Sequence, residues 1–360
     1  MSDNPVATPT TTKDKTKDPE QKKGDEYVLD KGKKVSNLSV GTFLATLLSP
    51  VTLLTIPMFQ RINYWINVNM LDDYDTYKSN HELMAPLVLN PISSLGSLSY
   101  HPILHFDGVT EKEFAKDVHD TQVVIGNHVG YTDFLILMQI AIHYGVESNI
   151  VAYFMKSLTK WPVLGPTLWA QIPLARDGSK KDLEKLNSRL DLYANSDSSH
   201  LFALFPEGGL PYNPKLHERT LKKCEEYGTA LKYMNFPKTS GLSHLIRKVG
   251  HKIRYVYTFV LVYTPKSSKV HVIVKRICKV SEVPKEPTSE YVTKHKLTIN
   301  EDNRLFYAHE EFLLDWTEKT DRFLEKYYQS FPEDERPTVV NTLKKKFPEA
   351  EAEEEDSDGS

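Results

Sequence analysis

The chain contains little of what would make it a disulfide scaffold or a nucleic-acid-binding protein. Only two of its 360 residues are cysteine, Cys224 and Cys278. They lack metal-ligand spacing and cannot form a disulfide framework, which favours a reducing compartment. The formal net charge is −3, so no basic excess is available to hold a nucleic acid.

Several sequence patterns are also absent. No secretory signal opens the chain, and no internal repeat is present. The Gly-x-Ser-x-Gly elbow that presents the serine of many lipases and thioesterases is missing, so that class of hydrolase has no support. Hydrophobic residues make up 40% of the chain, which is enough for a sizeable core in one large domain or two small ones.

Strand-like and helix-like patterns alternate after residue 85. Short β-branched and aromatic runs predict strands at 123–125, 150–155, 200–205, 254–263 and 270–280. Apolar residues at helical spacing predict helices at 134–144, 181–195, 216–233 and 310–328. The alternation favours an α/β fold with a mixed sheet flanked by helices, in one domain over residues 85–332.

A histidine and an aspartate stand directly after the first of these strands. Asn127 precedes His128, and Asp133 follows five positions after the histidine. A carboxylate that binds one imidazole nitrogen fixes the tautomer, so the other nitrogen can take a proton from a hydroxyl. We therefore interpret His128 as a candidate base, Asp133 as its orienting partner and Asn127 as a residue that fixes the turn. The alternative is a hydrogen-bonded loop without chemistry.

A second motif, at 205–209, follows the strand at 200–205. Glu207 is a candidate to accept a hydrogen bond from an acceptor hydroxyl, and Gly208 permits close backbone approach to a ligand. The alternative for Glu207 is a solvent-exposed loop carboxylate. Three cations beside apolar or proline-containing stretches are candidates to bind phosphate: Lys156, Arg176 and Lys238. For any one of them taken alone, an ordinary surface cation is the better-supported alternative.

These motifs, in this order, resemble those of the glycerophospholipid acyltransferase superfamily. His128 and Asp133 match its His-x4-Asp motif, 172–176 is similar to its second motif and 205–208 to its third. Further stretches, at 156–165, 236–241, 255–263 and 315–332, are similar to the lysocardiolipin, lysophosphatidylinositol and 1-acylglycerol-3-phosphate acyltransferases. The resemblance implies transfer of an acyl chain from acyl-CoA to a lysophospholipid, without a metal or a resident cofactor. It also implies an endoplasmic reticulum membrane, with the catalytic domain facing the cytosol.

The chain departs from the family pattern at two places. The third motif of many relatives continues with threonine and, in bacterial members, arginine, where this chain has Gly209 and Leu210. That substitution removes a phosphate contact and weakens the expectation of phosphatidic-acid synthesis. Lys238 stands where many relatives of this branch have arginine, which keeps the charge but loses the fork of donors. A non-catalytic lipid-binding or scaffold protein that retains the fold is therefore the alternative function.

Residues 35–60 carry no charged side chain. A bilayer crossing needs about 20 apolar residues, so one crossing fits by length. However, Pro50 would break such a helix, and the lysines at 31, 33 and 34 favour a cytosolic N-terminus. One crossing would then separate the domain from cytosolic acyl-CoA. We therefore expect residues 35–70 to form a membrane-embedded or interfacial helical hairpin, with Arg61, Tyr64 and Trp65 at headgroup level. The alternative is a pair of buried core helices.

The two ends of the chain are expected to be disordered. Residues 1–34 are polar and rich in Lys, Asp, Thr and Pro, so they bury too little apolar surface to offset the entropy of ordering. Residues 333–360 are expected to be an acidic, solvated tail. No hydrophobic segment follows the catalytic region, so the N-terminal hairpin is expected to be the principal membrane anchor.

Overall fold

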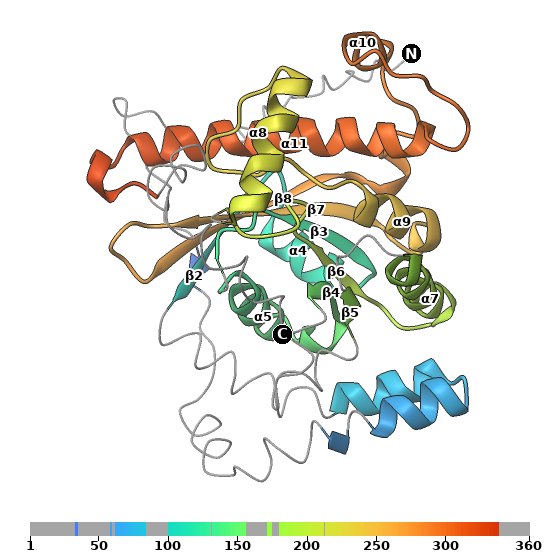
Figure 1. Cartoon of the computed structure of the whole chain (residues 1–360). Coiled ribbons are helices and arrows are strands. Elements are labelled where there is room, and N and C mark those ends of the chain that lie inside the picture. The colour runs from blue at the N-terminus through green and yellow to red at the C-terminus, as the bar shows by residue number, and fades with distance from the viewer. Residues whose placement is uncertain are drawn as a thin grey trace, which may run out of the picture.

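The computed structural model describes residues 33–34, 58–59, 62–83, 100–130, 132–155, 171–174, 180–211 and 213–337. Its centre is a mixed sheet of eight strands in the order β1-β2-β8-β7-β3-β6-β4-β5 (Figure 1). The strands are β1 Lys33–Lys34, β2 His101–Asp107, β3 Gln122–Gly126, β4 Ile150–Met155, β5 Ile172–Leu174, β6 Leu201–Leu204, β7 Tyr255–Tyr263 and β8 Lys269–Lys279.

The strand directions decide where a functional site can form. β3 pairs in parallel with both β6 and β7, and β4 pairs in parallel with β6 and β5. β7 turns back into β8 as an antiparallel hairpin, and β8 pairs in parallel with β2. The carboxyl ends of β3, β6 and β7 therefore meet at one edge, where α/β proteins bind their ligands.

Helices cover both faces of the sheet. They are α4 Glu111–Asp117, α5 Asp133–His143, α7 Lys180–Asn195, α8 Pro214–Tyr227, α9 Ser240–Val249, α10 Ser289–Lys294 and α11 Arg304–Gln329. A π-helical segment spans Trp65–Met70, and residues 74–83 are helical. Single 3-10 turns occupy Glu147–Asn149, Val280–Glu282 and Glu333–Glu335.

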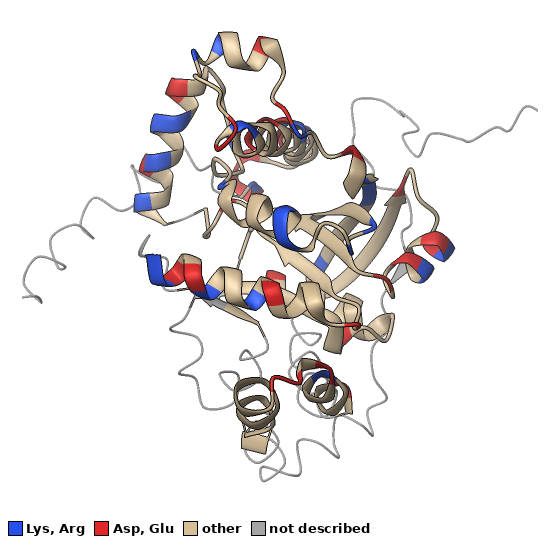
Figure 2. Cartoon of the chain, turned by 90° about the vertical axis from the view of Figure 1, so that its right-hand side faces the viewer, with Lys and Arg blue, Asp and Glu red and all other residues tan. Residues whose placement is uncertain are grey.

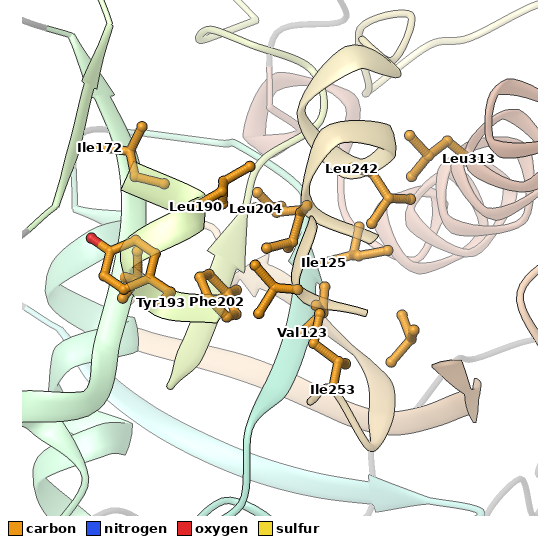
Figure 3. Close-up of a cluster of buried hydrophobic side chains, with 14 of the residues drawn as sticks. Val123, Ile125, Ile172, Leu190, Tyr193, Phe202, Leu204, Leu242, Ile253 and Leu313 are labelled. Carbon is orange, nitrogen blue, oxygen red and sulfur yellow. The ribbon is translucent and has the colours of Figure 1, made fainter. Parts of the chain in front are cut away.

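Two hydrophobic cores lie on opposite faces of the sheet, and β3 contributes to both. Val123 and Ile125 belong to the core under α7, α9 and α11 (Figure 3). Val124 faces the other way, into the core that contains α4 and α5. Because both faces are buried, the central strands are continuous apolar runs rather than alternating ones. Each fully buried aliphatic side chain contributes roughly 1.5–3 kcal/mol to folding.

The expected α/β fold with a mixed sheet flanked by helices is confirmed, and two element boundaries are corrected. The helix expected at 216–233 ends at Tyr227, because Gly228 adopts a left-handed conformation with φ 60° and closes it. The helix expected at 310–328 begins earlier, at Arg304. The sequence patterns did not indicate β2, α4, α9 or α10.

Residues 62–83, which precede β2, pack against α7. The Tyr74 ring lies edge-on to Tyr193 of α7 at 5.6 Å, and the Arg189 guanidinium lies 4.3 Å above the Tyr64 ring. The hairpin bend expected near Pro50 lies outside the described residues. No helix within the described ranges combines the length and the apolarity needed to cross a bilayer.

The two ends of the chain are described only in part. Lys33 and Lys34 pair with β2, although residues 1–34 were expected to be disordered. Residues 1–32 lie outside the described residues. Of the expected acidic tail, residues 333–337 are described and include the 3-10 turn Glu333–Glu335. Residues 338–360 also lie outside the described part.

Two buried histidines lie beside the tyrosines of this contact. His200 is 1% exposed, and neither of its ring nitrogens has a hydrogen-bond partner among the described residues. His81 stacks on Tyr77 with ring centroids 5.7 Å apart. Burial lowers the pKa of both histidines to about 3. Both imidazoles are therefore neutral in the folded protein at any pH well above that value.

This burial predicts a specific loss of stability in acid. From the ordinary pKa of 6.5 down to about 3, the unfolded chain binds protons on these histidines that the folded chain does not. Each histidine then lowers the free energy of unfolding by about 1.4 kcal/mol per pH unit. His200→Phe should reduce that slope by one histidine's share, as measured by urea unfolding between pH 7.5 and pH 4. The exposed His119, changed to Gln, should leave the slope unchanged, and an unaltered slope in His200→Phe would contradict the interpretation.

Candidate active site

Asp133 is fully buried and accepts hydrogen bonds at both carboxylate oxygens. Oδ2 accepts from His128 Nδ1 at 2.8 Å and from the N–H groups of Val129 and Gly130 at 2.6 and 3.0 Å. Oδ1 accepts from the Tyr263 hydroxyl at 2.7 Å. These donors replace the water that a buried carboxylate loses, and they leave the side chain one orientation.

His128 lies at the surface end of this arrangement. Its Nδ1 is bound to Asp133, and its side chain remains 23% exposed. Nε2 has no hydrogen-bond partner within the described residues. Because a carboxylate holds Nδ1 as the N–H donor, Nε2 carries the lone pair that a general base requires. The dyad can therefore take a proton from a hydroxyl placed against that nitrogen.

Asn127 fixes the chain just before the histidine. Its side chain donates from Nδ2 to the Leu261 carbonyl at 3.0 Å and accepts from the Leu261 N–H at 2.7 Å. This side chain therefore continues the β3–β7 pairing by one step beyond Gly126. Asn127 is 1% exposed, so it holds the turn and has no free amide group for a ligand.

Glu207 lies beneath the same loop rather than in solvent. Its Oε1 accepts from the His128 N–H at 2.6 Å, and its Oε2 accepts from the Asn235 N–H at 2.7 Å. It is 1% exposed, so the alternative of a solvent-exposed loop carboxylate is wrong. Burial raises the pKa of Glu207 to about 8, against the opposing effect of the two N–H donors.

Gly208 and Lys238 come together from different segments. Gly208 has φ +74°, a conformation that disfavours any side chain. A Cβ built there would lie 2.7 Å from Cδ of Lys238, so the lysine side chain passes directly over the glycine. The Lys238 N–H also donates to the Pro206 carbonyl at 2.6 Å. The close approach to Gly208 is therefore made by this exposed cation.

Phe205 forms the floor below the histidine. Its ring stacks on His128 with centroids 4.9 Å apart and planes 30° apart. A Cβ at Gly126 would lie 3.1 Å from Cε1 of Phe205, so the absence of a side chain on Gly126 gives the phenyl ring room. Beside the Phe205 ring lies a cavity of about 10 Å³, which is lined by Asp133 and by apolar residues that include Leu137 and Phe259. It holds about one water molecule at most.

The structure thus brings together six of the eight candidate residues: Asn127, His128, Asp133, Glu207, Gly208 and Lys238. Lys156 and Arg176 lie outside the described residues. Tyr263 was not among the candidates, because its β-strand pattern predicts only a strand position. Within the described residues, no group of three or more His, Cys, Asp or Glu side chains is arranged to hold a metal ion.

Residues 109–259 match the model of a protein family described as Acyltransferase. The matched segment contains His128, Asp133 and Glu207, and it is similar to acyltransferases as a class. The match supports an acyltransferase enzyme and does not distinguish one branch of acyltransferases from another. No curated protein gives a significant match to the chain.

Tyr263→Phe should lower acyltransferase activity by about tenfold, because it removes one hydrogen bond of roughly 1.5 kcal/mol from Asp133. Tyr257→Phe is a matched control on the same strand. It removes a 2.6 Å phenol–carboxylate bond to Asp117 near the opposite end of β7. Both variants should unfold at lower denaturant concentrations, but only Tyr263→Phe should lose activity. Equal activity in the two variants would contradict the assignment of Tyr263 to the site.

Proposed function

We propose that the protein is an acyl-CoA-dependent O-acyltransferase that esterifies a glycerol hydroxyl of a lysophospholipid, of the lysophosphatidylinositol, lysocardiolipin or lysophosphatidate type. The observation that carries the proposal is the His128–Asp133 pair, with Nδ1 bound at 2.8 Å and the ring partly exposed at the carboxyl edge of the sheet. The family match supports acyl transfer, and the similarity of the other motifs supports this donor and acceptor.

In the proposed reaction, Nε2 of His128 takes the proton of the acceptor hydroxyl as its oxygen attacks the thioester carbonyl carbon. The carbonyl oxygen becomes an oxyanion, and its collapse breaks the carbon–sulfur bond. The CoA thiolate takes the proton from the imidazolium, which yields CoA thiol and the new ester. Asp133 stabilises the imidazolium without accepting its proton, as carboxylates do in hydrolytic triads. We propose no hydrogen-bond donor to this oxyanion among the described residues.

The remaining candidates have different roles in this proposal. Both oxygens of Glu207 accept backbone N–H groups, so we infer that it fixes the His128 loop rather than contacting the acceptor. Lys238 is exposed beside Gly208, and this position supports its proposed role in binding a phosphate group. Lys156 and Arg176 remain candidates for the same task, because the resemblance includes their motifs.

An exposed apolar surface supports the proposal that the protein acts at a membrane. Seven of the ten large hydrophobic side chains exposed in the described ranges lie between residues 58 and 71: Met58, Phe59, Ile62, Trp65, Ile66, Met70 and Leu71. The described residues of this segment carry no charge, and one of the two helices at the bottom of Figure 2 is tan throughout. Tyr64 and Val68 face the domain instead. We propose that the apolar side lies in the lipid interface, with residence at the endoplasmic reticulum and a cytosolic catalytic domain.

The first test is release of CoA thiol by detergent-solubilised protein. Oleoyl-CoA is supplied with lysophosphatidylinositol, lysocardiolipin, lysophosphatidate or no acceptor, and the same assays are run on His128→Ala. Removal of the general base should lower the rate by at least about 100-fold, without loss of folded protein. The matched control is the exposed His119→Gln, which should keep full activity.

The assay also separates the alternatives. Release that requires one acceptor and disappears in His128→Ala supports the transferase and identifies its substrate class. Release without any acceptor indicates a thioesterase. Folded protein that binds lysolipid but releases no CoA supports the scaffold alternative, for which the substituted third motif at Gly209 and Leu210 gives a reason.

Glu207→Gln separates positioning from acceptor binding. The amide places an NH₂ group against one of the two backbone N–H donors, so one donor loses its acceptor at a cost of about 1–3 kcal/mol. If Glu207 fixes the His128 loop, kcat should fall by about tenfold or more while the KM for the lysolipid stays unchanged. A raised KM with normal kcat would show instead that the carboxylate binds the acceptor. Steady-state kinetics with varied lysolipid distinguish the two.

A further inference from the structure

A buried carboxylate of α11 organises a loop that lies far from it in sequence. Asp321 is 3% exposed. Its Oδ2 accepts from the Lys232 N–H at 2.9 Å, and its Oδ1 accepts from the N–H groups of Tyr233 and Met234 at 2.7 and 2.9 Å. One side chain thus receives three consecutive backbone donors, which is a strong restraint on the loop because hydrogen bonds to charged groups are the strongest type.

The next N–H of this loop belongs to the site already described. Asn235 donates to Glu207 Oε2 at 2.7 Å, and the other oxygen of Glu207 accepts from the His128 N–H at 2.6 Å. Four consecutive donors, 232–235, are therefore divided between two buried carboxylates. The next N–H, of Phe236, donates to the Thr220 hydroxyl, and the Lys238 N–H donates to the Pro206 carbonyl. The described hydrogen bonds therefore connect α11 to His128 through consecutive residues of the loop.

We propose that Asp321 is a positioning residue for His128, acting through the 232–235 loop and Glu207. The inference rests on the proposed catalytic role of the histidine, but its structural part stands separately. Asp321 orders the loop so that Asn235 meets Glu207, and Glu207 then fixes the backbone of His128. Asp133 fixes the ring of the same residue from the other side. Backbone and imidazole are thus held by different carboxylates, and one of these depends on α11.

A second buried carboxylate on α11 provides a matched control. Glu310 is 7% exposed, and its Oε2 accepts from the hydroxyls of Tyr227 and Tyr291 at 2.9 and 3.2 Å. Those tyrosines pack in a third cluster with Cys224, Leu231, Phe236 and Leu314, outside the two cores that flank the sheet. In the described hydrogen bonds, Glu310 has no connection to Glu207. Its loss should weaken the attachment of α10 without moving His128.

The experiment compares the full-length wild type with Asp321→Asn, Asp321→Glu and Glu310→Gln. Asp321→Asn keeps one acceptor oxygen but places an NH₂ group against a backbone donor. Hydrogen exchange by mass spectrometry should then be about tenfold faster at His128 and Asn235. The kcat should fall by about tenfold, with an unchanged KM for acyl-CoA. Asp321→Glu, which restores both acceptors, should return kcat to within about threefold of wild type.

Glu310→Gln should lower the unfolding temperature and leave the His128 exchange and kcat at wild-type values. Faster exchange at 232–234 with normal exchange at His128 would overturn the proposal, because the restraint would then end at the loop. Equal losses in Asp321→Asn and Glu310→Gln would also overturn it, since they would reflect general loosening of α11. A wild-type protein without acyl transfer would refute the proposed function alone, because the exchange measurement still tests the positioning of His128.

Discussion

The site depends on two carboxylates, Asp133 and Glu207, that are buried at the edge where β3, β6 and β7 end. A buried anion is stable only when hydrogen-bond donors replace its water, and each missing donor costs several kcal/mol. Backbone N–H groups at 128, 129, 130 and 235 supply most of these donors. The loop that carries His128 is therefore shaped by the need to supply hydrogen-bond donors to two buried carboxyl groups. The histidine geometry is a consequence of that need.

The mixed sheet makes this arrangement possible. Parallel pairing of β3 with both neighbours brings three chain ends to one edge, and Asn127 extends the pairing to Leu261 with its side chain. The two hydrophobic cores hold the strands from opposite faces, so the edge cannot shift without disturbing one of them. The apolar outer side of residues 58–71 has no such covering in the described structure. This contrast separates the edge of the sheet, which is packed from both faces, from a segment whose apolar side chains are exposed.

The sequence patterns predicted features that depend on neighbouring residues, but they did not predict contacts between segments that are distant in sequence. The apolar runs at 123–125 and 254–263 indicated central strands, because both faces of these strands are buried. The pairing of His128 with Asp133 could be expected from five positions of spacing. The role of Asn127 in fixing the turn was expected too, but its partner Leu261 and the partner of Glu207 at Asn235 were not, since both are backbone groups distant in sequence. The helix that ends at Tyr227 was predicted to continue to residue 233, because its amphipathic spacing continues past Gly228. The left-handed φ of Gly228, which closes the helix, is set by the fold and not by that spacing.

The site also extends beyond the segment that the acyltransferase family model matches. That segment ends at residue 259, yet Leu261 holds Asn127 and Tyr263 holds Asp133. α11 adds Asp321, which accepts three consecutive backbone N–H groups at 232–234, and the next N–H, of Asn235, donates to Glu207. A motif can therefore be intact while its geometry depends on residues outside it. Substitutions after residue 259, in the last strands or in α11, are expected to alter catalysis without touching the matched segment, because a displacement of about 1 Å at the base is enough to slow proton transfer.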